Sequence, residues 1–158
     1  MKKTIQYIFI ITLVILAYQF TKNPNEEDST GSLSWHVNFD NVLEEAQKSG
    51  KPILINFTGS DWCPYCIKLD EEVFAKKPFE DWAAKNAILF RCDFPRTIHQ
   101  PDSIKQQNNS LAQKYGISGF PTVLLIDFKG NVLAKSGYQR GGSASWVASL
   151  NSQVQTKD

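Results

Sequence analysis

Two cysteines, Cys63 and Cys66, stand close together directly after a short apolar segment that ends at Phe57. The apolar residues predict a buried strand, and the residues that follow the cysteines have helical spacing. Residues 59–61 (Gly-Ser-Asp) are typical of a loop, and Pro64 suits the first turn of a helix because it has no backbone N–H to leave unpaired. The sequence therefore predicts a strand that passes through a loop into a helix whose first turn carries both sulfurs.

The predicted position of Cys63 at the start of a helix has chemical consequences. The first turn of a helix leaves backbone N–H groups without partners and carries a partial positive charge. A thiol in that position ionises more readily than a free cysteine, and the thiolate is the reactive form. We therefore expect Cys63 to be an exposed nucleophile with a low pKa and Cys66 to resolve the mixed disulfide from a more buried position. Such an exchange needs no cofactor.

Charge and cysteine content narrow the classes of protein that remain. The formal net charge is +1, and Lys and Arg are scattered rather than gathered in the basic stripe that nucleic-acid binding requires. Three cysteines are too few for a small disulfide-stapled protein, so a pair plus one further thiol indicates chemistry. A hydrophobic fraction of 42% is ordinary for one globular domain.

The first twenty residues differ in kind from the rest of the chain. Two lysines precede an apolar run from about Ile5 to Phe20, which is typical of a signal peptide or a membrane anchor over residues 1–20. No clear small-residue cleavage site follows, so both alternatives remain open. The polar residues 21–32 predict a flexible linker. Either alternative predicts a domain in the periplasm or otherwise outside the cytoplasm, anchored to the inner membrane if the segment is retained.

Hydrophobic periodicity and turn residues predict the elements of a domain over residues 33–153, followed by a tail at 154–158. We expect strands at 35–39, 53–57, 87–94, 122–127 and 132–135, with the last two joined as a hairpin. We expect helices that begin at Asp40 or Asn41, at Cys63, near Pro78, at Asp102 or Ser103, and at Ser143. Alternating strands and helices predict an α/β fold with a central mixed sheet flanked by helices.

The helix after Cys63 is predicted to be amphipathic. Apolar spacing places one set of its residues toward the core, namely Cys66, Ile67, Leu69, Val73 and Phe74. The charged residues are expected on the solvent side, namely Lys68, Asp70, Glu71 and Glu72.

Residues 62–66 (Trp-Cys-Pro-Tyr-Cys), together with residues 119–122 (Gly-Phe-Pro-Thr) at the head of the hairpin, resemble the thioredoxin fold family. Residues 57–63, with the upstream segment 39–52, are similar more narrowly to exported bacterial thioredoxin-like proteins, which include the DsbH-type periplasmic disulfide reductases. The resemblance implies a thiol–disulfide oxidoreductase that reduces disulfides in protein substrates. It also implies a DsbD-type membrane thiol reductase as the electron donor.

The resemblance assigns roles to further residues of this sequence. Pro121 corresponds to the proline that is cis and faces the disulfide, and the backbone of Phe120 would pair with an extended substrate segment. The bulk of Phe120 would also narrow the choice of substrate. The full set of substrate-binding residues implied beside the two cysteines is Trp62, Pro64, Tyr65, Phe120 and Pro121.

Two features depart from the pattern of thioredoxins. Thioredoxins carry a buried aspartate on the strand before the motif, which helps to move the proton of the second cysteine, and the matching position here is Asn56. Proton transfer to Cys66 must then use water or another group, for which Asp61 and Lys68 are candidates. The Pro-Tyr pair between the cysteines is typical of glutaredoxins, although Trp62 argues against membership of that class.

Several alternatives remain open at this point. The protein could act as a disulfide oxidase or isomerase, or as a binding or metal-delivery module whose cysteines are secondary. A zinc site needs four ligands, and besides the pair only Cys92, His36 and His99 remain, so we predict no metal site. Cys92 alternates with Ile88 and Phe90, which predicts a buried and inert thiol.

Overall fold

The computed structural model describes residues 33–155, so the predicted signal or anchor at 1–20 and the predicted linker at 21–32 lie outside the described residues. Its centre is a mixed sheet in the order β2–β1–β3–β4, in which β1 is parallel to β2 and antiparallel to β3, and β3 is antiparallel to β4. The strands are β1 (Ile53–Thr58), β2 (Ile88–Asp93), β3 (Thr122–Ile126) and β4 (Val132–Ser136). The predicted α/β fold with a mixed sheet is confirmed.

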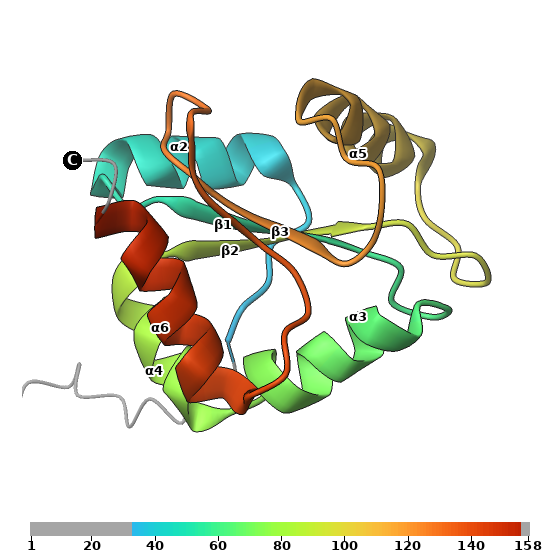
Figure 1. Ribbon diagram of the computed structural model, residues 1–158. Helices are drawn as coiled ribbons and strands as arrows, with labels where there is room; N and C mark the ends of the chain where they lie inside the picture. The colour runs from blue at the N-terminus through green and yellow to red at the C-terminus, as the bar shows by residue number, and fades with distance from the viewer. Residues whose placement is uncertain (1–32, 156–158) are drawn as a thin grey trace, which may run out of the picture. The chain divides into compact units, whose positions relative to one another are not determined.

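Helices cover both faces of this sheet (Figure 1). One face, here the α2/α5 face, lies under α2 (Phe39–Ser49) and α5 (Asp102–Lys114). The other, here the α3/α6 face, lies under four segments, α3 (Pro64–Leu69), the π-helical segment η1 (Asp70–Phe74), α4 (Lys77–Asn86) and α6 (Gly142–Gln155).

Strand β1 contributes side chains to the cores on both faces of the sheet, because successive side chains of a strand point in opposite directions. Ile53, Ile55 and Phe57 pack into the core of the α2/α5 face. Leu54 packs on the α3/α6 face against residues that include Leu69 and Trp146. All six residues of β1 are buried, as expected for a strand covered on both sides.

The predicted opening strand at 35–39 is wrong. His36 forms only an isolated bridge beside Phe90, and Phe39 already belongs to α2. The helix begins earlier than predicted because the side chain of Asn38 caps it by accepting the N–H of Asn41. Its predicted end is confirmed, since Gly50 occupies the left-handed conformation at φ 71°.

The helix after Cys63 also differs from the prediction. Its α-helical part ends at Leu69 and continues as η1, where Ala75 N–H donates to the Asp70 carbonyl. Ile67, expected in the core, is 39% exposed. Asp70, expected in solvent, is half-buried and lies beside Arg91. Position along the helix, rather than residue type, decides which side chains face the sheet.

The remaining predicted elements are confirmed with small shifts at their ends. The short helix near Pro78, the strand around Phe90, the helix from Asp102, the hairpin and the final helix all form. Within residues 33–155, no helix combines the length and the apolar character needed to cross a membrane.

Candidate active site

Cys63 and Cys66 form a disulfide at the start of α3, with an S–S distance of 2.22 Å and a Cα–Cα distance of 5.2 Å. Cys63 is the N-cap residue of the helix, and its Sγ accepts the backbone N–H of Cys66 at 3.3 Å. Cys63 is 5% exposed and Cys66 is 1% exposed. The expectation of an exposed Cys63 is therefore wrong for the disulfide form, although Cys63 is the more accessible of the two.

The loop before Cys63 is held by two carboxylates. Asp93 on β2 accepts both the backbone N–H of Ser60, at 3.0 Å, and its hydroxyl, at 2.6 Å. Asp61 accepts five hydrogen bonds from four donor groups of residues 96–98, of which the shortest come from the N–H of Thr97 at 2.7 Å and its hydroxyl at 2.5 Å. The Thr97 hydroxyl and these backbone N–H groups hold the pKa of Asp61 well below its usual range.

Trp62 joins the motif to the head of the hairpin. Its indole N–H donates to the Phe94 carbonyl at 2.8 Å, and the Arg96 guanidinium lies 3.8 Å from the ring centroid. The ring meets Phe120 edge-on at 6.1 Å between centroids, and the Phe120–Pro121 peptide is cis, as the resemblance implied. The fold therefore brings together Trp62, which precedes Cys63 directly, and Phe120, 58 positions further along the chain.

The indole of Trp62 also explains the glycine at the start of the loop. A Cβ atom at Gly59 would lie 2.5 Å from the Trp62 ring, far inside van der Waals contact. Because the indole is fixed by its hydrogen bond and by Arg96, the ring cannot move aside cheaply.

Comparisons with known proteins agree with this geometry. The thioredoxin-like domain family matches residues 39–147. The disulfide bond reductase DsbH of Chlamydia pneumoniae is 33% identical over 129 residues, which cover 82% of this chain and 77% of that protein. The chain belongs to the thioredoxin-like family.

Solved structures show the same relationship. A structure described as DsbH oxidoreductase superposes with a TM-score of 0.75 at 35% identity, covering 78% of this chain and 85% of that one. A thioredoxin from Thermus thermophilus superposes with a TM-score of 0.58 at 19% identity, covering 77% and 86%, which shows the shared fold. The protein is thus a thioredoxin-like thiol–disulfide oxidoreductase with its disulfide in a Cys-X-X-Cys motif.

On the other side of the disulfide, this thioredoxin-like protein presents two tyrosines. Tyr65 is 58% exposed and lies 5.5 Å from the Tyr138 ring, and the hydroxyl of Tyr138 donates to Glu72 at 2.8 Å. Pro64 is exposed beside Tyr65. Lys68, a candidate for proton transfer to Cys66, is exposed, and its Nζ lies 5.9 Å from the centroid of the Tyr65 ring.

The third cysteine lies in a different environment. Cys92 is fully buried on the α2/α5 face, where its Sγ is 3.8 Å from the Asn108 carbonyl. Burial, with a smaller effect of the charge on Asp93, raises the pKa of the Cys92 thiol well above its usual range. The prediction of a buried thiol is confirmed, and this thiol remains protonated at neutral pH.

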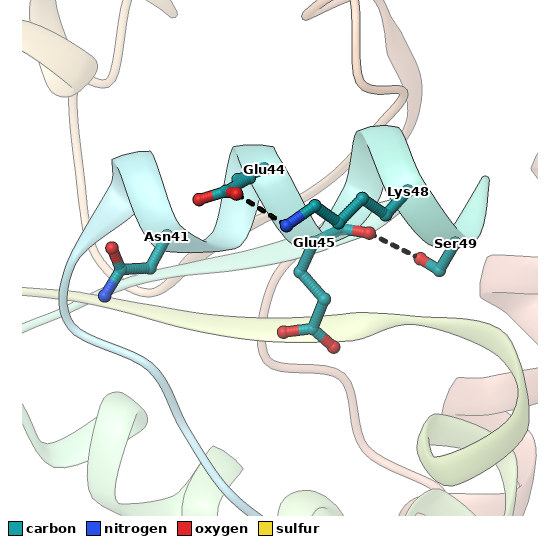
Figure 2. Close-up of a pocket in the computed structure, with 5 residues that line it drawn as sticks. All are labelled: Asn41, Glu44, Glu45, Lys48 and Ser49. Atoms are coloured by element: carbon teal, nitrogen blue, oxygen red, sulfur yellow. Dashed lines mark hydrogen bonds and ion pairs between the residues drawn. The ribbon is translucent and has the colours of Figure 1, made fainter.

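A surface pocket on α2 does not belong to this chemistry. It has a volume of about 390 Å³ and lies along α2, which covers the face of the sheet opposite α3 (Figures 1 and 2). Its lining is polar and comes from one helix, with Lys48 paired to Glu44: Asn41, Glu44, Glu45, Lys48 and Ser49. No group of three or more His, Cys, Asp or Glu within residues 33–155 is arranged to hold a metal ion.

Sequence reasoning missed four residues that shape the site, namely Asp70, Arg91, Asp93 and Arg96. Arg91, Asp93 and Arg96 come from β2 or the loop after it. Their respective partners, Asp70, Ser60 and Trp62, lie more than twenty positions earlier in the chain. Only Asp70 carried a signal, because it follows Cys66 by one helical turn and so shares its face.

Proposed function

We propose that this protein reduces disulfide bonds in protein substrates, with Cys63 as the attacking and Cys66 as the resolving thiol. The observation that carries the proposal is the hydrogen bond from the Cys66 N–H to the Cys63 Sγ at the start of α3. The same donor would stabilise a thiolate at Cys63 once the disulfide is opened, because hydrogen bonds to the charged form lower a pKa.

In the proposed reaction, the Cys63 thiolate attacks one sulfur of a substrate disulfide and displaces the other as a thiolate. Cys66 then attacks the Cys63 sulfur, which closes the Cys63–Cys66 disulfide and releases the second substrate thiol. Two electrons pass from the dithiol to the substrate. We place the substrate against two exposed residues, Pro64 and Tyr65, and three partly buried ones, Trp62, Phe120 and Pro121.

The test is an insulin-reduction assay with the Cys63→Ser variant, and Cys92→Ser is the matched control. We expect the Cys63→Ser variant to fall to the uncatalysed rate, because it lacks the nucleophile. The Cys92→Ser variant should retain its activity, since its thiol is buried on the other face of the sheet. Activity that survives the loss of Cys63 would overturn the proposal.

We further propose that the direction of electron flow is reduction. Related folds span reduction potentials from roughly −270 to −120 mV, and about 30 mV corresponds to 1.4 kcal/mol for two electrons. The kinship with a disulfide bond reductase over most of the chain supports the reducing end. We expect equilibration of the Cys63–Cys66 couple with glutathione to give a potential nearer −270 mV, and a value near −120 mV would instead indicate an oxidase.

The proposed location is outside the cytoplasm, with a DsbD-type membrane thiol reductase as the electron donor. The support is the basic and apolar pattern of residues 1–20 together with the resemblance to exported reductases. Reconstitution with the purified donor should convert the oxidised protein to the dithiol form, as measured by thiol alkylation. Failure of that transfer would exclude this donor.

A further inference from the structure

Four buried polar atoms without a hydrogen-bond partner among the described residues belong to side chains beneath α3 and η1. They are Asn56 Oδ1, Thr58 Oγ1, Asp70 Oδ1 and Arg91 Nε, and their residues are here called the polar layer. Native proteins satisfy nearly all buried polar atoms, so four such atoms together call for an explanation.

The members of the polar layer share one face of the sheet. Asn56 and Thr58 alternate with Leu54 on β1, so their side chains point to the α3/α6 face as that of Leu54 does. Asn56 and Thr58 are each 1% exposed. Arg91 on β2 is the register partner of Asn56, and its Nη2 lies 3.7 Å from Asp70 Oδ1.

Asp70 is the member of the polar layer that lies on the same segment as the disulfide. It follows Cys66 by one helical turn, and its backbone N–H donates to the Cys66 carbonyl. Residues one turn apart share a face, and helical side chains lean toward the N-terminus. The carboxyl group of Asp70 therefore leans toward Cys66, which is the buried sulfur of the pair.

The carboxyl group of Asp70 also reaches solvent. Its side chain is 29% exposed although Oδ1 is buried, and that of Arg91, which packs over the Trp35 ring, is 32% exposed. A proton on Asp70 thus has a route from the interior to the surface.

The electrostatic surroundings favour proton transfer by Asp70. Burial raises its pKa, the Arg91 guanidinium opposes that rise, and the charges of Asp93 and Glu71 add to it. Of the other elements packed on η1, α6 carries no charged side chain. Three charged residues of α4 are exposed, namely Lys77, Asp81, with which it pairs, and Lys85, and its fourth charged residue, Glu80, is partly buried. A carboxyl pKa displaced toward neutrality makes a better proton acceptor and donor.

We propose that Asp70 takes the proton of Cys66 when Cys66 resolves the mixed disulfide, a task for which the polar layer finds only neutral side chains, Asn56 and Thr58, on β1. The inference deepens the proposed function and rests on it. Asp61 cannot perform this task because its oxygens are engaged by residues 96–98, and Lys68 points to solvent beside Tyr65.

The proposed step balances as follows. The S–H proton of Cys66 passes to the Asp70 carboxylate, directly or through a water held by the unpartnered atoms of the polar layer, which offer the two to four partners that such a water needs. The Cys66 sulfur forms a bond to the Cys63 sulfur, and the bond from Cys63 to the substrate sulfur breaks. The substrate leaves as a thiolate and takes a proton from solvent, while Asp70 returns its proton to solvent.

The test separates the two chemical steps in a single-turnover reaction between the reduced protein and a disulfide-containing protein. The Asp70→Asn variant keeps the shape of the side chain and removes the acceptor. We expect its resolution step to slow by about 10²-fold at pH 7, the low end of general acid–base contributions, while attack by Cys63 changes by less than about two-fold. The pH dependence of resolution that belongs to Asp70 should also disappear.

The matched control is Asp102→Asn, the same substitution at an exposed carboxylate of α5 on the opposite face of the sheet, which should leave both steps within about two-fold of wild type. A second variant adds Asn56→Asp to Asp70→Asn and returns a carboxylate to the polar layer from β1. Recovery of the resolution rate by this double variant would show that the layer needs a carboxylate rather than Asp70 as a structural part.

The outcomes are distinguishable. Resolution by Asp70→Asn at the wild-type rate and with the wild-type pH profile would overturn the inference and leave the proposed function standing. A wild-type protein whose Cys63 does not attack the substrate disulfide would overturn the proposed function itself.

Discussion

The two faces of the sheet give a buried cysteine two different environments. On the α2/α5 face, Cys92 is enclosed by apolar side chains such as Phe90 and Phe57, and burial keeps its thiol protonated. On the α3/α6 face, Cys66 is equally buried but belongs to a helix that lies over the polar layer and ends beside Arg91. Burial alone therefore does not decide the state of a cysteine, because Cys66 has a second sulfur on the same helical turn and the free Cys92 does not.

The comparison can be tested first by removing one thiol from each face. The Cys66→Ser variant should accumulate a stable mixed disulfide between Cys63 and its substrate, because no resolving thiol remains. The Cys92→Ser variant should form no such adduct beyond the wild-type level. Non-reducing gel electrophoresis followed by mass spectrometry measures both, and adducts of equal abundance would contradict the division between the faces.

A substitution in the core of the α2/α5 face should mainly lower the stability of the fold. Phe90→Ala removes a fully buried ring that packs against Phe39, and such truncations cost about 3–5 kcal/mol. Denaturant unfolding measures the loss, and the rate of disulfide reduction per folded molecule should stay the same. A variant that unfolds like wild type but reduces disulfides slowly would show that this face takes part in the chemistry.

A substitution in the polar layer should mainly change the pH dependence of resolution by Cys66. The Arg91→Gln variant loses the positive charge that holds down the pKa of Asp70, so that pKa should rise further. Only the ionised carboxylate accepts a proton. The fall in the rate of resolution by Cys66 at acid pH (the acid limb of its pH profile) should therefore move to higher pH. Arg91→Lys keeps the charge and should shift the limb less, and a limb that stays in place or moves to lower pH would contradict this arrangement.

The smallest expected effect is on the free energy of unfolding, when a buried side chain of each face is replaced by one of similar shape and opposite polarity. Thr58→Val replaces a buried hydroxyl that has no hydrogen-bond partner within residues 33–155 and should raise the free energy of unfolding by about 1 kcal/mol. Val42→Thr buries a new hydroxyl on the α2/α5 face and should lower it by about 1–3 kcal/mol. Thermal denaturation at matched pH compares the two, and changes of the same sign would contradict the comparison.

The sequence was sufficient for the fold and the redox pair because both depend on local patterns. Apolar runs such as Ile53–Phe57 predict strands, Gly50 ends a helix, and the spacing of Cys63 and Cys66 predicts a disulfide on one helical turn. These signals do not require knowledge of which distant segments meet.

The polar layer could not be predicted in the same way. Asp70 was assigned to solvent by its charge, although its distance from Cys66 places it on the buried face, and its partner Arg91 lies on another strand. The opening strand failed for a similar reason. Gln107, from α5, contacts the backbone of Val37 and Phe39, so a distant side chain instead of a strand neighbour holds that segment.

The two carboxylates that hold the loop before Cys63 have a consequence for the catalytic cycle. Ser60 is bound by Asp93, and Asp61 binds residues 96–98, so neither anchor includes a sulfur atom. Breaking the link between Cys63 and Cys66 leaves both anchors in place. The oxidised and the dithiol forms therefore offer nearly the same outline, and one recognition surface can serve both halves of the redox cycle.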